Sequence, residues 1–201
     1  IKKTAGKILT WDQKPINTVY HASNGGVMAS VDEAWSTNKV PYLKMRLDGP
    51  SNWSRRVVLP LSNEKYLKSF LFSDSKAFGS DHPLFRWNRT LDASQITRQL
   101  NQARKISRSF KPIKIKVVSR GTSGRATSLK IDGSTGTAIF LKLDEIRRVL
   151  KQLPSTLFVV KEIKEGKWLF SGGGFGHGAG MSQSGAIDLA RNGWTTKQIL
   201  S

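Results

Sequence analysis

The chain has 201 residues, of which 38% are hydrophobic, enough for the core of one domain or of one domain with a small subdomain. It contains no cysteine and no run of eighteen apolar residues, which excludes disulfides, thiolate metal sites and a membrane-spanning helix. Lysine and arginine outnumber aspartate and glutamate by 33 to 14, and a net charge of +19 attracts polyanions such as nucleic acid, anionic lipid and acidic cell-wall polymers. The basic residues are spread along the chain, so a generally basic surface is the simplest interpretation.

The N-terminal quarter is predicted to hold a hairpin followed by a long loop. Residues 6–11 and 16–20 alternate as two strands about a turn. The second strand delivers His21 to a Ser-Asn-Gly-Gly turn at 23–26. Proline and glycine interrupt any periodicity over 31–53, so this segment is predicted to be a loop. Its aromatic side chains are expected to pack in the core, although exposed rings can also stack on sugars.

The middle of the chain is predicted to combine helices with an antiparallel meander. A short helix over 63–72 precedes a second helix over 93–105, which begins with a capping box at Asp92. The run 113–117 alternates apolar residues with lysine, so its apolar side chains are expected to face the core. Two further strands follow after short turns, at 126–131 and 137–141.

The C-terminal part is predicted to contain a helix over 143–150, which ends before Pro154, and a hairpin formed by 157–163 and 167–170. A helix that begins at Ser182 closes at Asn-Gly, and another follows it. Together these patterns predict an α+β fold, a single domain over 1–201 that is rich in antiparallel strands and has a few short helices.

The second hairpin strand runs into the most distinctive stretch of the chain. Residues 171–185 are Ser-Gly-Gly-Gly-Phe-Gly-His-Gly-Ala-Gly-Met-Ser-Gln-Ser-Gly. The six glycines that precede Ser182 allow positive φ and close approach to the backbone, so His177 is displayed on nearly bare main chain in front of a helix N-terminus. This combination predicts a binding site. The alternative is that His177 only satisfies backbone groups within a tight glycine loop.

This stretch resembles the signature of the stage II sporulation protein D family, which includes the amidase enhancer proteins. The family pattern is Gly-Trp-Gly-His-Gly-Val-Gly-(Met or Leu)-Ser-Gln-(Tyr or Trp)-Gly-Ala. Phe175 stands in place of the tryptophan and Ser184 in place of the second aromatic residue. Further blocks of the family recur in order at 20–26, at 31–35 with 41–43, and at 119–125, so the resemblance covers nearly the whole chain.

The resemblance implies a lytic transglycosylase that cleaves peptidoglycan glycan strands already stripped of stem peptides. One carboxyl group can act as acid and then as base in that reaction, because water is not the nucleophile. The relatives' catalytic glutamate lies upstream of the block that begins here at Ile1, and no glutamate of this chain falls at its position. We therefore expect a chain truncated at both ends, with its catalytic residue unassigned.

The resemblance also implies a substrate cleft, with residues 174–183 as one wall and residues 20–26 as the facing wall. Arg120 and Arg125 are expected to meet muramic lactyl carboxylates, for which a planar guanidinium is suited. The implied substrate-binding residues are Gly176, His177, Gly178, Ser182, Gln183, Tyr20, His21, Ser23, Arg120 and Arg125.

The expected partners are peptidoglycan glycan strands and, as a second candidate, an amidase. A zinc ion is held in some relatives by a histidine and cysteines near His21; without cysteine, no metal or other cofactor is expected here. The implied location is extracytoplasmic, in the cell envelope or secreted. Two other functions stay open: a non-enzymatic amidase enhancer or wall-binding module, and nucleic-acid binding, which ranks last because no recognition motif accompanies the charge.

Overall fold

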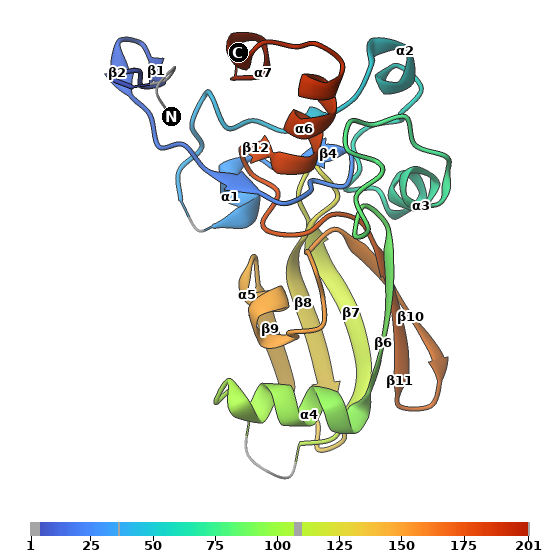
Figure 1. Cartoon of the computed structure of the whole chain (residues 1–201). Helices are drawn as coiled ribbons and strands as arrows, with labels where there is room; N and C mark the ends of the chain where they lie inside the picture. Colours follow the sequence, from blue (N-terminus) through green and yellow to red (C-terminus); the bar gives the residue numbers. More distant parts are fainter. Residues whose placement is uncertain (1–4, 36, 107–109, 201) are drawn as a thin grey trace.

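The computed structural model describes residues 5–35, 37–106 and 110–200, and it confirms the predicted α+β fold (Figure 1). Its helices are α1 (Val31–Ala34), α2 (Ser51–Ser54), α3 (Glu64–Phe72), α4 (Ala93–Gln102), α5 (Glu145–Val149), α6 (Gln183–Arg191) and α7 (Thr196–Leu200). Its strands are β1 (Thr10–Trp11), β2 (Lys14–Pro15), β3 (Tyr20–His21), β4 (Val27–Met28), β5 (Arg46–Leu47), β6 (Trp87–Asp92), β7 (Pro112–Arg120), β8 (Ala126–Gly133), β9 (Ala138–Lys142), β10 (Phe158–Lys164), β11 (Lys167–Gly172) and β12 (Met181–Ser182). Within the described ranges, no helix has the length and apolar content needed to cross a bilayer.

Two three-stranded antiparallel sheets, ordered β7-β8-β9 and β10-β11-β6, supply most of the main core. In the first sheet, Ile131 pairs with Ile115 on one side and with Ile139 on the other, so apolar side chains share one face. The second sheet contributes Trp168 and Phe170. Helices α4 and α5 add apolar side chains to the same core, and α4 crosses the end of the sheets farthest from α6 (Figure 1).

The meander and the second hairpin lie where the sequence predicts them, with one correction and one omission. Ile113 is 51% exposed rather than buried, because the β7–β8 register shifts between Pro112 and Lys114. Strand β6 was not predicted. Its two buried apolar residues, Trp87 and Leu91, are four positions apart, a spacing that fits a strand and a helix equally, and Arg89 between them interrupts the apolar alternation.

The N-terminal quarter departs most from the prediction. The hairpin is only β1 and β2, because Asp12 and Gln13 both take positive φ and close a two-residue turn at once. The predicted return strand over 16–20 does not pair with β1. The predicted loop over 31–53 contains α1, α2 and β5, which pairs with β4. Trp53 packs in a second buried cluster, as expected for an aromatic residue of this segment.

The helix caps follow the sequence closely. Asp92 Oδ1 accepts a hydrogen bond from the Gln95 amide at 2.8 Å, and Gln95 Oε1 accepts one from the Asp92 amide at 2.9 Å, which completes the predicted capping box. Ser182 caps α6, and its Oγ accepts from the Gly185 amide at 3.3 Å. This cap orients the glycine-histidine stretch relative to α6.

Candidate functional site

Two loops that lie about 150 residues apart form one hydrogen-bonded layer, which we call the double loop (residues 20–29 and 174–183). Strands β3 and β12 run parallel within it. Ser23 and Phe175 exchange backbone hydrogen bonds of 3.1 and 2.7 Å, and the Ala29 amide donates to the Gly178 carbonyl at 2.8 Å. The loops were predicted to be facing walls of a cleft. The structure corrects this: they are neighbours in a single wall.

Two glycines of the double loop are required by contacts within the protein. Gly176 has φ of 111° and Gly178 has φ of 83°, a region that side chains rarely adopt. A Cβ on Gly176 would lie 2.8 Å from the Cβ of His21, and a Cβ on Gly178 would overlap the guanidinium of Arg125. The bare backbone predicted to receive a ligand is thus already covered on this side by His21 and Arg125.

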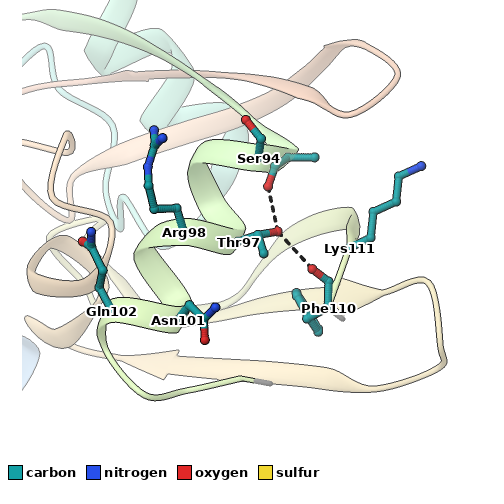
Figure 2. A pocket seen from close by; sticks show the side chains of 8 residues that line it. Ser94, Thr97, Arg98, Asn101, Gln102, Phe110 and Lys111 are labelled. Atoms are coloured by element: carbon teal, nitrogen blue, oxygen red, sulfur yellow. Dashed lines mark hydrogen bonds between the residues drawn. The ribbon is translucent and has the colours of Figure 1, made fainter. Parts of the chain in front are cut away.

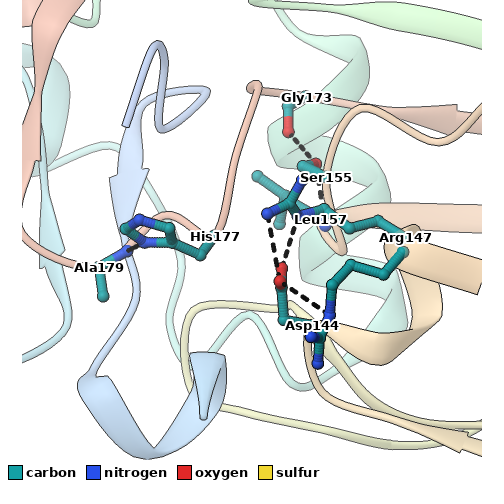
Figure 3. A network of polar contacts seen from close by, with 8 residues as sticks. Asp144, Arg147, Ser155, Leu157, Gly173, His177 and Ala179 are labelled. Atoms are coloured by element: carbon teal, nitrogen blue, oxygen red, sulfur yellow. Dashed lines mark hydrogen bonds and ion pairs between the residues drawn. The ribbon is translucent and has the colours of Figure 1, made fainter. Parts of the chain in front are cut away.

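His177 is held by its own loop and remains half-buried at the surface. Its Nδ1 accepts a hydrogen bond from the Ala179 amide at 3.2 Å (Figure 3). Its ring centroid lies 4.5 Å from that of Trp35. Burial lowers the pKa of His177, while the carboxylate of Asp144 opposes this shift. The imidazole is therefore neutral at pH 7, and its hydrogen bond to the Ala179 amide helps to order the loop.

Asp144 and Arg147 form a polar pair on α5 next to this histidine, and neither was predicted from the sequence (Figure 3). Arg147 Nη2 donates to Asp144 Oδ2 at 3.1 Å. The Asp144 amide donates to the Ala34 carbonyl at 3.3 Å, which ties α5 to the helix that precedes Trp35. Sequence reasoning had no signal for this pair, because charged residues on a short helix usually face solvent.

His21 is buried and lies beneath the surface of the double loop. Its side chain is 4% exposed, and its Nδ1 donates to the Ala179 carbonyl at 3.0 Å, which leaves the lone pair on Nε2. Burial, reinforced by the positive charge of Arg125, lowers the pKa of His21 to about 3. His21 therefore supports the layer as a neutral imidazole and is not placed to touch a ligand.

The structure does not support the predicted role of Arg120 and Arg125 as anchors for carboxylates. Arg125 is fully buried, and its Nη1 and Nη2 each donate at 2.9 Å to a backbone carbonyl, those of Val27 and Asn24. The Arg120 side chain is 6% exposed, and its Nη1 donates to the Phe158 carbonyl at 2.7 Å. Burial lowers the pKa of both guanidiniums to about 10. Both arginines satisfy buried carbonyls of the protein itself.

Other predicted residues divide between the interior and the surface. Ser23 and Ser182 are buried, and Gly178 is buried as well. Tyr20 is 62% exposed and Gln183 is also exposed. Phe175, which takes the place of the family's tryptophan, is 43% exposed. The double loop therefore exposes two aromatic rings, Tyr20 and Phe175, and holds the neutral imidazole of His177 half-buried.

A cavity of about 630 Å³ opens beside β3 and β12. Its lining includes Tyr20, Ser182, Tyr42, Arg46 and Asp48, together with apolar side chains from the N-terminal segment and α7. Burial raises the pKa of Asp48, the Asn24 amide opposes this shift with a 2.5 Å hydrogen bond, and the charge of Asp188 adds to it. This open cavity lies along one edge of the double loop, and the sequence did not predict it.

A second hollow, of about 800 Å³, lies on α4, and none of its lining residues belongs to the predicted site (Figure 2). Its lining includes Arg98, Asn101 and Lys111. Thr97 Oγ1 donates to the Ala93 carbonyl at 2.9 Å and the Phe110 carbonyl at 3.0 Å, so this hydroxyl is committed to holding α4 against the start of β7.

The carboxylate of Glu33 is buried, and it accepts hydrogen bonds from neighbouring residues of the protein itself. Glu33 is 4% exposed, and its carboxylate accepts hydrogen bonds from the Thr122 hydroxyl at 2.8 Å and from Ser123. Among the described residues, no three His, Cys, Asp or Glu side chains converge as metal ligands.

The chain matches a protein-family model described as "Domain of unknown function (DUF8618)" over residues 29–180, which is 152 of its 201 residues. The chain belongs to this family. The DUF8618 match includes the glycine-histidine stretch through Gly180 and the buried Glu33, whereas Tyr20 and His21 lie outside it.

Similarity to characterised proteins extends over the whole chain. It is 28% identical to the amidase enhancer of Bacillus subtilis (strain 168), across 100% of this chain and 30% of that protein. It is 26% identical to the stage II sporulation protein D of Bacillus amyloliquefaciens, across 98% of this chain and 46% of that protein. The Bacillus subtilis (strain 168) stage II sporulation protein D is 25% identical, across 100% and 47%. The predicted family resemblance is confirmed, and the chain spans less than half the length of these relatives.

Proposed function

We propose that this chain binds peptidoglycan glycan strands through the surface of the double loop, as part of an extracytoplasmic protein of the lytic transglycosylase type. The observation that carries the proposal is that the double loop exposes two aromatic rings, Tyr20 and Phe175, and holds the neutral imidazole of His177 half-buried at its surface. Flat rings held on a hydrogen-bonded layer are suited to stack on the C–H faces of sugar rings. Gly176 and Gln183 border this surface, so a sugar hydroxyl can meet polar groups beside the rings.

We further propose that the general acid comes from outside residues 1–201. A general acid must be protonated in the resting enzyme and free to reach the leaving oxygen. Asp144 is paired with Arg147, and the Glu33 carboxylate is held by Thr122 and Ser123. Asp48 differs, because burial raises its pKa and it lines the cavity. If this chain alone cleaves strands, Asp48 is the first residue to replace.

The test incubates this chain, and a version extended upstream, with peptide-stripped glycan strands and identifies the products by mass spectrometry. The proposal expects binding by both forms and anhydro-muramic ends from the extended form alone. Cleavage by the short chain would place the acid within it. Failure of either form to bind strands would overturn the proposal.

Binding is assigned to the double loop by a His177→Ala variant, for which we expect at least a fivefold weaker affinity for stripped strands. His82→Ala is the matched control, since His82 Nδ1 also accepts a backbone amide two residues on, at 3.1 Å, but lies outside the double loop. An unchanged affinity in folded His177→Ala would show that the imidazole only orders its loop.

The similarity to the amidase enhancer supports a second candidate function, in which this domain binds the wall and activates an amidase without cutting glycan. Faster turnover of a purified amidase in the presence of this chain, with no anhydro-muramic product from either form, would favour this candidate.

A further inference from the structure

The outer face of the β7-β8-β9 sheet carries a group of lysines that the double loop does not explain. We call it the lysine face: Lys114 and Lys116 on β7, Lys130 on β8, and Phe140 and Lys142 on β9. The opposite face of the same strands is buried in the main core. Since side chains alternate between the two faces of a strand, the lysine face is fixed toward solvent, and a one-residue slip would bury it.

The register of the sheet brings like charges together on this face. Lys116 lies directly opposite Lys130, and such cross-strand partners have Cβ atoms only about 5 Å apart. Lys130 Nζ lies 2.8 Å from Asp132 Oδ1. Among the described residues, Lys114, Lys116 and Lys142 take part in no ion pair. Asp132 also lies directly opposite Lys114, so the face carries four lysines against one carboxylate. The face therefore holds an excess of positive charge, an arrangement that an anionic partner would relieve.

The lysine face also includes one aromatic side chain, Phe140. Phe140 lies opposite Lys130 and is 50% exposed, and Val118 on β7 is 52% exposed. Exposed apolar side chains on a folded surface often mark a contact site. Lysines around a single ring suit a ligand that combines sugar rings with carboxylates. Single-stranded nucleic acid instead stacks successive bases on several aromatic side chains.

The lysine face also begins close to the double loop. Arg120 and Ala126 pair at one end of the β7–β8 ladder, and the turn between them leads to Arg125, whose guanidinium lies beneath Gly178. The strands extend away from that end toward α4 (Figure 1). Along β8 the lysine face extends from Ser128, which pairs with Lys142, to Asp132, which pairs with Lys114. At about 3.3 Å per residue, these five residues make the face roughly 13 Å long.

We propose that the lysine face binds an anionic polysaccharide, namely a peptide-stripped glycan strand whose muramic residues carry free lactyl carboxylates. This inference rests on the proposed function and adds to it a second contact area. The lysines pair with carboxylates and Phe140 stacks on a sugar ring. Strands that retain their stem peptides have these carboxylates in amide linkage, so the lysine face selects stripped strands.

The test measures the affinity of the folded chain for stripped strands and for the same strands with their carboxylates chemically reduced to alcohols. The variant Lys116→Gln/Lys130→Gln should weaken binding to stripped strands by about five- to tenfold. It should leave binding to reduced strands unchanged. Its thermal midpoint should equal or exceed that of the wild type, because it removes a like-charge pair. The double variant Lys161→Gln/Lys167→Gln, with exposed lysines on the other sheet, is the matched control for net charge.

Each outcome separates this inference from the proposed function. If the wild type binds stripped strands and the variant at Lys116 and Lys130 binds them equally well, the lysine face is not a contact area, although the proposed function stands. If the wild type does not bind strands, both the lysine-face inference and the proposed function are wrong. If the control variant Lys161→Gln/Lys167→Gln weakens binding to stripped strands equally, the effect comes from net charge and the lysine face is not a specific contact area. Tight binding of oligo-dT that this variant abolishes, without an effect on strands, would make the face a nucleic-acid surface.

Discussion

Burial of His21 should make the folded protein sensitive to acid. The pKa of His21 is lowered from 6.5 to about 3 by burial, so below pH 6.5 the unfolded chain binds a proton that the folded chain does not. The stability that depends on neutral His21 is fully present above pH 6.5 and is lost as the pH falls toward 3. The loss amounts to about 0.8 kcal/mol at pH 6 and about 2 kcal/mol at pH 5.

The variant His21→Asn isolates this effect. An asparagine amide can still donate to the Ala179 carbonyl, as Nδ1 of His21 does at 3.0 Å, but it does not titrate. Urea unfolding at pH 7.5, 6 and 5 gives the free energy of unfolding for both proteins. We expect the wild type to lose about 2 kcal/mol more than the variant between pH 7.5 and pH 5. His82→Asn controls for removal of a histidine as such.

The absolute stability of His21→Asn at pH 7.5 does not enter this comparison, because loss of the ring also removes packing. Only the difference between the pH profiles reports the titration of His21. Parallel profiles for the wild type and His21→Asn would refute the reasoning, since they would mean that His21 accepts a proton in the folded double loop without cost.

Two further predictions concern stability at neutral pH and are checked by urea or thermal unfolding. Gly178→Ala should lower the free energy of unfolding by about 2 kcal/mol or more, because its Cβ would overlap the Arg125 guanidinium. The control is Gly136→Ala, which is also at positive φ but has open space around it and should lower the free energy of unfolding by about 1 kcal/mol. Equal losses would remove the packing argument. Ile115→Ala should lower the free energy of unfolding by about 2 to 4 kcal/mol, because Ile115 is buried. Ile113→Ala should lower it by under about 0.5 kcal/mol, because Ile113 is exposed. A larger loss for Ile113→Ala than for Ile115→Ala would contradict the register shift in β7.

The sequence predicted elements whose signals are local. The capping box at Asp92 and the cap at Ser182 depend on partners three residues away in the chain. The burial of Ile115 and Ile131 follows from alternation along single strands. Prediction from the sequence failed where strand pairing joins segments that are distant in the chain. In strand β6 the polar Arg89 interrupts the apolar alternation between Trp87 and Leu91. Strands β3 and β12 pair over only two residues each, too short for any pattern.

The family and the importance of the glycine-histidine stretch were determined by the sequence itself, because the order of glycines around His177 is distinctive without any structure. The tertiary structure decided what those residues contact. Arg125 looks like a surface arginine in sequence, yet it lies fully buried under Gly178 and is bound by two backbone carbonyls. Desolvation and hydrogen-bond partners determine the role of an ionisable side chain, and both depend on segments that meet only after the chain folds.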